Sequence, residues 1–104
     1  MKRQIPYPQP GDILAGEFLL PMQITPYRLA KELNVPLTPM TAILAGKRAV
    51  TADAGLRLPR FFGSSEGYWV GLQMDYDTAL AKAALAGELE AITSCFNLRA
   101  AVPA

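Results

Sequence analysis

The chain of 104 residues contains no histidine and a single cysteine, Cys95. Catalytic triads use a base that titrates near neutral pH, and zinc sites use clusters of Cys and His, so most such sites are excluded. A single cysteine also excludes an intramolecular disulfide. We interpret Cys95 as a plain free thiol rather than a nucleophile. With no glycine loop of the kind that cradles phosphates either, we expect no enzymatic activity, no metal and no cofactor.

Long apolar runs are also missing. Residues 1–10 carry two positive charges, but no apolar stretch follows them, which excludes a signal peptide. No segment is long and apolar enough to span a bilayer. We therefore expect a cytoplasmic protein, and the length fits one domain.

The net charge of +1 hides an asymmetry between the two parts of the chain. Residues 1–63 hold eight basic and four acidic side chains, a net charge of +4, whereas residues 64–104 hold two basic and five acidic ones, a net charge of −3. A basic N-terminal part suits a polyanionic partner. An acidic C-terminal part suits a basic protein partner, or no partner at all.

The pattern along the chain predicts an N-terminal arm followed by five short helices and no strand. Alternating Pro6, Pro8 and Pro10 favour an extended arm. The first helix is expected over residues 11–20, ended by Pro21. The second follows an N-cap at Thr25 and ends at Asn34, a residue that tolerates the left-handed conformation.

The remaining helices are predicted from similar signals. The third helix is expected after an N-cap at Thr38, with Pro39 at its first position, and closes at Gly46. The fourth is capped by Thr51 and runs to Phe62. Ser64 or Ser65 is expected to cap the fifth, whose apolar stripe comprises Trp69, Leu72, Tyr76, Leu80 and Ala83. Together they form an all-α bundle.

Two features leave questions open. Pro59 lies inside the fourth helix, where its ring presses on the carbonyl of Gly55, so we expect a kink. The tail from Gly87 is compatible with a sixth helix or with a loose arm. We therefore divide the chain into a helical domain over residues 1–86 and a tail over residues 87–104.

The second and third helices have the pattern of a helix-turn-helix. Ala30 is small where the two helices cross, and Asn34 lies where the chain reverses. Leu29, Leu33, Val35, Met40, Ile43 and Leu44 point inward, which leaves Leu37, Thr38, Pro39, Thr41, Ala42 and Ala45 outside. In DNA-binding proteins of this kind, that outer face enters the major groove. Many pairs of helices joined by a short turn bind no DNA, and spacing alone does not separate the two cases.

Several segments resemble the HigA-type antitoxins, in order and without gaps over residues 9 to about 80. They are Gln9-Pro10-Gly11-Asp12-Ile13-Leu14, Tyr27-Arg28-Leu29-Ala30-Lys31-Glu32-Leu33, Val35-Pro36, Ile43-Leu44-Ala45-Gly46-Lys47-Arg48, Thr51-Ala52-Asp53-Ala54-Gly55-Leu56-Arg57-Leu58, Phe61-Phe62-Gly63-Ser64-Ser65, Trp69 and Leu72-Gln73. The resemblance implies a five-helix, lambda-repressor-like DNA-binding domain that dimerises. It also implies binding to the chain's own operator, with repression of its own operon, and neutralisation of a toxin that is a small ribosome-dependent RNA endonuclease.

The chain departs from the family on the outer face of the third helix. That face has no Arg, Lys, Gln or Asn, the residue types that make bidentate contacts to base edges, and Pro39 stands where the family often has Arg. We therefore predict low intrinsic sequence specificity. The expected base-facing residues are Leu37, Thr38, Pro39, Thr41 and Ala42, and the expected phosphate contacts are Thr25, Arg28, Lys31, Lys47 and Arg48. For Lys31 a solvated helix face is the alternative, and for Arg57 it is the preferred interpretation.

The aromatic stripe of the fifth helix also has two interpretations. Aromatic residues at helical spacing usually belong to the core. Alternatively, Trp69, Leu72, Tyr76 and Leu80 form a dimer seam, because a terminal helix has little core left to face. The whole chain likewise has a second interpretation, as a protein-interaction module that kept the helix-turn-helix fold but lost sequence-specific DNA reading.

Overall fold

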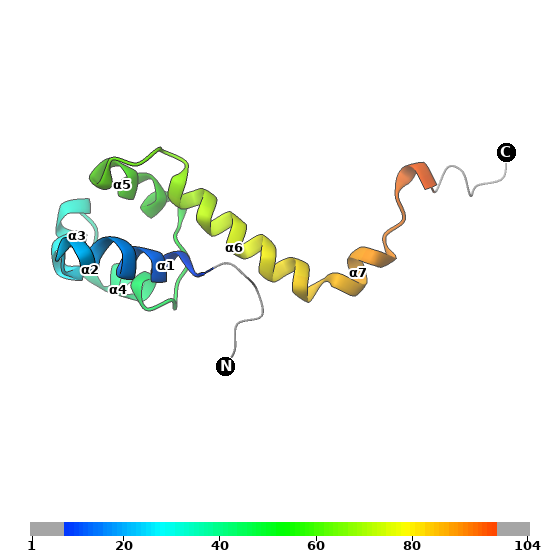
Figure 1. Cartoon of the computed structure of the whole chain (residues 1–104), viewed down its shortest axis with the longest axis horizontal. Coiled ribbons are helices and arrows are strands. Elements are labelled where there is room, and N and C mark those ends of the chain that lie inside the picture. The colour runs from blue at the N-terminus through cyan, green and yellow to red at the C-terminus, as the bar shows by residue number, and fades with distance from the viewer. Residues whose placement is uncertain (1–7, 98–104) are drawn as a thin grey trace.

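The computed structural model describes residues 8–97, and this part of the chain is helical with no strand. The helices are α1 (Pro10–Ile13), the π-helix η1 (Leu14–Leu19), α2 (Leu20–Met22), α3 (Pro26–Leu33), α4 (Leu37–Leu44), α5 (Ala52–Phe62), α6 (Tyr68–Ala84) and α7 (Ala86–Ala91). Figure 1 shows a globular body from which α6 projects, with α7 at its far end. The predicted all-α fold is confirmed, whereas the predicted N-terminal arm lies largely outside the described residues.

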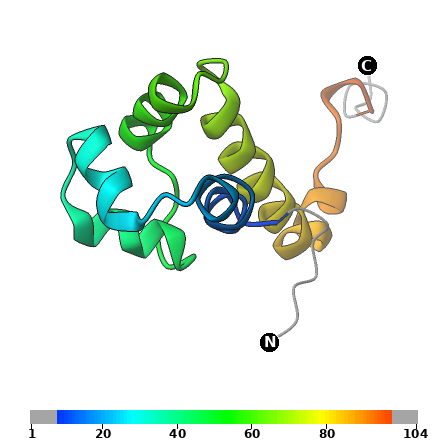
Figure 2. The ribbon, with the colours of Figure 1, turned by 60° about the vertical axis from the view of Figure 1, so that its left-hand side comes forward.

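The first helical segment is longer than the sequence predicts, because α1, η1 and α2 form one continuous run. Figure 2 views this run nearly end-on. We expected Pro21 to end the helix, and this was wrong. Pro21 lies in the last turn, where its missing N–H removes a single bond, and the run ends only at Gln23, which is left-handed at φ 58°. The N–H of Leu20 bonds to the carbonyl of Ala15, five residues back, as in a π-helix.

The helix-turn-helix is formed by α3 and α4. Thr25 caps α3 as predicted, since its Oγ1 accepts a hydrogen bond of 3.0 Å from the N–H of Arg28, and Asn34 is left-handed at φ 60°. The predicted start of the next helix was wrong: α4 begins at Leu37, and Thr38 caps nothing. Pro39 is accommodated at its third position because the first N–H groups of a helix have no partner within the helix.

The second half of the body is built from α5 and α6, which pack against each other. Thr51 caps α5 as predicted, and its Oγ1 accepts from the N–H of Ala54 over 3.2 Å. The helix continues through Pro59 for three further residues. The predicted serine cap of α6 was wrong, because α6 begins only after Gly67 and has no side-chain cap.

The core lies between these helices and is centred on Trp69. Its indole contacts the rings of Phe18 and Tyr68, at centroid distances of 5.1 and 5.2 Å. The other buried apolar residues of this cluster are Leu14, Leu19, Leu29, Ala30, Leu33, Met40, Ile43, Val50, Ala54 and Leu58. The inward-facing residues predicted for the helix-turn-helix are therefore confirmed as core, with Val35 and Leu44 half-buried beside it.

Beyond the body, the chain continues as the exposed end of α6 and as α7. Within the described residues the tail contains most of α7 and a further helical turn at residues 95–97, and every residue from 80 to 97 is exposed. No helix among the described residues has the length and hydropathy to cross a membrane.

Candidate nucleic-acid interface

The outer face of α4 presents the residues that the sequence predicts to face base edges. Leu37, Thr38 and Thr41 are exposed, and Pro39 and Ala42 are half-buried. The opposite face of α4 is fixed in the core by its two buried apolar residues. This helix can therefore present one face outward while the other anchors it.

The chemistry of that face is mostly that of methyl and methylene groups. The hydroxyl of Thr41 donates a hydrogen bond of 2.9 Å to the carbonyl of Thr38, so its hydrogen is engaged inside the helix. Thr41 then offers its methyl group and an acceptor oxygen. Such a surface fits thymine methyl groups better than the paired donors and acceptors of a base edge.

The position of α4 depends on its contact with the start of α1. A Cβ atom added to Gly11 would collide with the carbonyl oxygen of Ile43. Because that oxygen belongs to the backbone of α4, it cannot move aside as a side chain would. Glycine at this position therefore allows the start of α1 to pack directly against the backbone of α4.

The loop after α4 carries Lys47 and Arg48, both exposed, and two glutamines hold its two ends. At one end, Gln9 Nε2 donates to the carbonyl of Gly46 over 3.4 Å. At the other, the buried N–H of Val50 donates to Gln73 Oε1 over 2.8 Å. Gly46 has φ 76°, and a Cβ there would collide with the amide of Gln9. The two basic side chains thus stand on a loop that is fixed at both ends.

The sequence offered these two glutamines only as parts of the family pattern and did not predict that they hold the loop. Gln73 is nine-tenths buried, and its Nε2 donates to Asp77 Oδ1 over 2.9 Å, so both ends of its amide are bonded. The available signal was a polar residue within the apolar stripe of its helix. Lys47 and Arg48 form no ion pair with any of the described residues, which leaves both cations available for an anionic partner.

Replacing Gln73 by methionine is expected to destabilise the fold by about 1–3 kcal/mol, because the buried N–H of Val50 then has no acceptor. Urea unfolding of the two proteins measures this difference. Asp77→Asn is the matched control, since the asparagine keeps an oxygen that can accept from Gln73 Nε2. Equal stability of Gln73→Met and the parent chain would show that the hydrogen bond contributes nothing.

The cations of α3 are less uniformly available. Arg28 Nε lies 2.7 Å from a carboxylate oxygen of Glu32, one turn away, in an exposed pair worth roughly 0.5 kcal/mol. A phosphate can compete for this arginine at little cost. Lys31 is exposed, and the hydroxyl hydrogen of Thr25 remains available although its oxygen caps the helix. The structure thus leaves both interpretations of Lys31 open.

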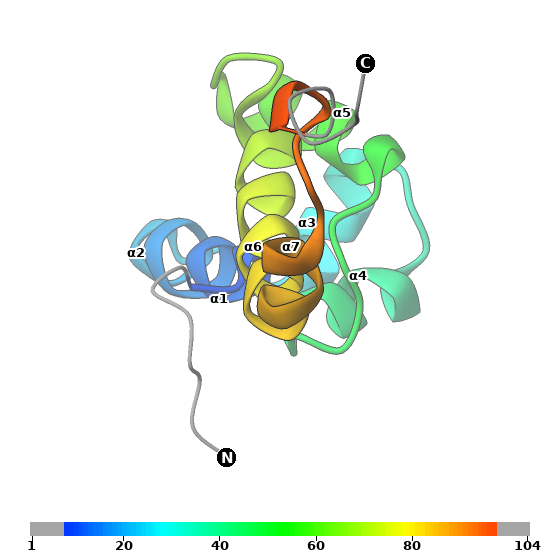
Figure 3. The same cartoon turned by 90° about the vertical axis from the view of Figure 1, so that its right-hand side faces the viewer.

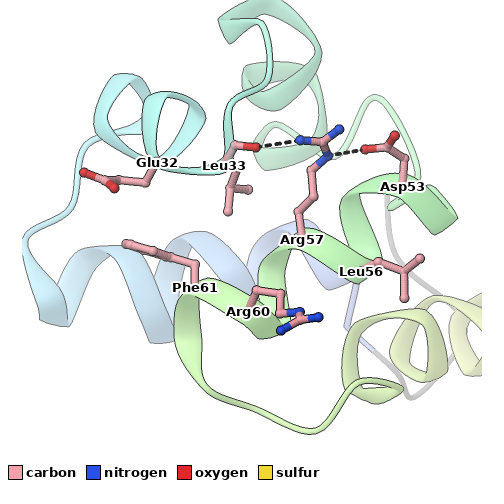
Figure 4. A pocket seen from close by; sticks show the side chains of 7 residues that line it. All are labelled: Glu32, Leu33, Asp53, Leu56, Arg57, Arg60 and Phe61. Atoms are coloured by element: carbon pink, nitrogen blue, oxygen red, sulfur yellow. Dashed lines mark hydrogen bonds and ion pairs between the residues drawn. The ribbon is translucent and has the colours of Figure 1, made fainter.

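Arg57 has a structural role that the sequence did not reveal. Its Nε lies 2.6 Å from Asp53 Oδ1, and its Nη1 donates to the carbonyl of Leu33 over 2.8 Å and to that of Asn34 over 3.4 Å. Figure 4 shows this side chain reaching from α5 to the end of α3. It satisfies carbonyls that have no partner within their helix. The preferred interpretation as a simply solvated residue was therefore wrong.

Comparison with known proteins identifies the family. No family model matches the chain. It is 38% identical over 81 residues to virulence-associated protein I of Dichelobacter nodosus, an alignment that covers 78% of this chain and 75% of the relative. It is 39% identical, with a TM-score of 0.77, to an addiction module antidote protein of the HigA family from Coxiella burnetii, covering 84% of this chain and 96% of that one. The chain belongs to the HigA family.

A second solved HigA structure adds information about the ligand of the relatives. The antitoxin HigA of Pseudomonas aeruginosa, solved with the higBA promoter, has a TM-score of 0.79 and 35% identity, covering 85% of this chain and 96% of that chain. The resemblance to the HigA-type antitoxins is thus confirmed at the level of the family.

The residues that the sequence offered for a HigA dimer seam occupy three different environments. Trp69 is 0% exposed, so it belongs to the core of its own chain and has no surface left for a partner. Tyr76 is also buried, and Leu72 is half-buried. Leu80 is 45% exposed on the projecting part of α6. Of the four, Leu80 has the most surface to offer to a second chain.

Proposed function

We propose that this chain is a DNA-binding antitoxin that represses its own operon. The observation that carries the proposal is the outward face of α4 next to Lys47 and Arg48, on a loop held at both ends. A related HigA antitoxin of known structure is bound to its promoter. Acting on DNA would place the protein in the cytoplasm.

In this function the basic residues provide most of the affinity for DNA, and the outer face of α4 fits the major groove. Lys47 and Arg48, with Thr25, Arg28 and Lys31 on the neighbouring helix, would contact phosphates. Leu37, Thr38, Pro39, Thr41 and Ala42 would face the major groove. Because these side chains lack bidentate donors, discrimination would rest on thymine methyl groups and on DNA shape, and we expect it to be weak for one subunit.

A homodimer would supply the missing discrimination. Two recognition helices that enter successive major grooves lie about 34 Å apart, one turn of the DNA. Each copy then adds its own phosphate contacts and its own fit to one half-site. The exposed Leu80 and the half-buried Leu72 support a seam along α6.

The antitoxin activity would use a different part of the chain. Residues 64–104 have a net charge of −3, which suits a basic protein. We propose that this partner is a small ribonuclease toxin. Purification of the chain together with the product of a neighbouring small basic reading frame tests this point. If that product is a ribonuclease and remains fully active when this chain is added, the proposal is contradicted.

A second candidate is a protein-interaction module that has lost base reading. The observation that favours it is the absence of long polar side chains on the outer face of α4. The exposed cations beside that face favour DNA instead.

Binding to two DNA duplexes separates these candidates. The purified protein is titrated with its own promoter fragment and with a scrambled duplex, each at two salt concentrations. We expect the promoter to bind about a hundredfold more tightly, approaching the range of specific sites. Equal affinity for the two duplexes, or no binding to either, would favour the protein-interaction module.

A further inference from the structure

The last described residues carry an apolar row that no other described residue covers. We call residues 85–97 the arm. Its apolar side chains are Leu85, Leu89, Ile92 and Phe96, spaced by four, three and four residues, and all four are exposed, the last two by 69% and 80%. Leu85 directly precedes α7 and Leu89 lies within it, whereas Ile92 and Phe96 follow its end at Ala91, so the row runs along the arm rather than on one face of a single helix. An exposed row of this kind marks a surface that a partner covers.

The arm cannot fold back onto its own body in this arrangement. The molecule measures 65 × 31 × 22 Å, and the arm lies at the end of its long axis opposite α5 (Figure 1). Figure 3 looks onto the arm end, with α7 in front of α6. The 17 residues of α6 separate the two ends by roughly 25 Å. None of the described residues of the same body can therefore cover the row, which points to another molecule.

The body offers an uncovered groove along α5. It consists of two adjoining pockets, with volumes of about 550 and 340 Å³, which share Leu56 and Arg60. Leu56 is 49% exposed, and Phe61 in the larger pocket is 37% exposed. Figure 4 shows these side chains around the larger pocket, with Arg60 at its edge. We call this surface the α5 groove.

The charges of the two surfaces allow one pairing, between the carboxylates of the arm and Arg60 of the groove. In the groove, Glu32 is paired with Arg28 and Asp53 with Arg57, and Arg60 has no ion pair with any of the described residues. Glu66, whose charge is opposite to that of Arg60, also lines the smaller pocket. The arm has Glu88 and Glu90 and no basic side chain. Pairing two arms with each other would bring four carboxylates together, whereas the groove offers them a guanidinium.

We propose that the arm of one copy lies in the α5 groove of a second copy, with Glu88 and Glu90 next to Arg60. This exchange of arms between two copies rests on the homodimer proposed above. If the two α6 helices pair antiparallel, each arm reaches the end of its partner where α6 begins, beside the smaller pocket. The apolar row then covers Leu56 and Phe61, and two reciprocal contacts reinforce the seam at Leu80.

A charge exchange tests the proposed contact. Arg60→Glu alone, and Glu88→Lys with Glu90→Lys alone, are each expected to weaken the dimer about tenfold or more at low salt. A chain with all three substitutions is expected to recover most of the loss, as measured by sedimentation equilibrium. All of these positions are exposed, so the fold is expected to tolerate them, and circular dichroism checks this. Independent, additive losses in the triple variant would overturn the proposal.

Cross-linking through Cys95 gives a second, independent measurement. A chain with Ser64→Cys and Cys95→Ser is mixed with the parent chain and treated with a short bis-maleimide reagent. We expect a covalent pair that joins residue 64 of one copy to Cys95 of the other, and no such product from the control Thr38→Cys, Cys95→Ser chain on α4. A dimer that gives only Cys95–Cys95 pairs, or no product, would overturn the exchange.

The same experiments separate this inference from the proposed function. A chain that is monomeric at the concentrations where it binds its promoter would remove both the homodimer and the exchange. A dimer that binds the promoter but fails the charge exchange would leave the proposed function intact. In that case, a basic protein becomes the candidate for the arm.

Discussion

A protein in which Lys47 and Arg48 are both replaced by alanine is expected to bind its promoter far more weakly at the same salt concentration. A dimer would lose four phosphate contacts. The slope of log affinity against log salt should become shallower by about 3 to 4, and the affinity at 0.1 M salt should fall on the order of a thousandfold. Fluorescence anisotropy over a salt series measures both quantities.

Site choice and fold should survive this double substitution. Phosphate contacts position the protein without reading sequence, so the ratio of promoter to scrambled affinity should change little. Both side chains are exposed on a loop held by backbone and glutamine contacts, so unfolding should be unaffected. Lys82→Ala, which removes an exposed cation from α6, is the matched control. An unchanged salt slope in the double variant would place the DNA elsewhere on the molecule.

The parts of this fold that the sequence predicted well are those decided by local chemistry. Thr25 and Thr51 cap helices because a side-chain oxygen meets an N–H three residues on. Asn34 ends α3 because asparagine tolerates a positive φ. The inner faces of α3 and α4 follow from helical spacing alone. The choice of family came from the order of several such segments, and the comparisons confirmed it.

The errors arose where tertiary contacts decide between local options. Thr38 is as good a cap by residue type as Thr25, but the turn after Asn34 already lets α4 begin at Leu37. Pro21 is a helix breaker by type, yet a proline in the last turn removes only one bond. Ser64 and Ser65 are also suitable caps by residue type, but α6 begins only after Gly67. Local residue types are compatible with several helix boundaries, and tertiary packing decides which of these boundaries occurs.

The candidate site was predictable only in part, for a different reason. The exposed residues of α4 follow from periodicity, and Lys47 and Arg48 follow from the family pattern. The contacts that hold their loop join residues 37 and 23 positions apart, so no local pattern contains them. The same holds for Arg57, whose partners at the end of α3 lie 23 and 24 residues away.

Replacing Trp69 by alanine is expected to destabilise the fold by about 3–5 kcal/mol, the usual effect of removing a large buried aromatic side chain. The indole is fully buried, and it joins three elements through the rings of Phe18, Phe62 and Tyr68. For a domain of this size, such a loss is a large share of the total stability. Thermal and urea unfolding measure it, and promoter binding should be lost along with the fold.

The conservative variant distinguishes the packing of this residue from its polarity. Trp69 Nε1 is buried with no hydrogen-bond partner among the described residues, so Trp69→Phe removes an unsatisfied donor together with part of the ring. We expect that variant to lose only about 1–2 kcal/mol, because the lost packing is partly offset. If Trp69 instead lay in a dimer seam, the alanine variant would unfold at an unchanged midpoint in the dilute monomer and differ only where dimers form. Measuring both variants across protein concentrations therefore tests the placement of Trp69 inside its own chain.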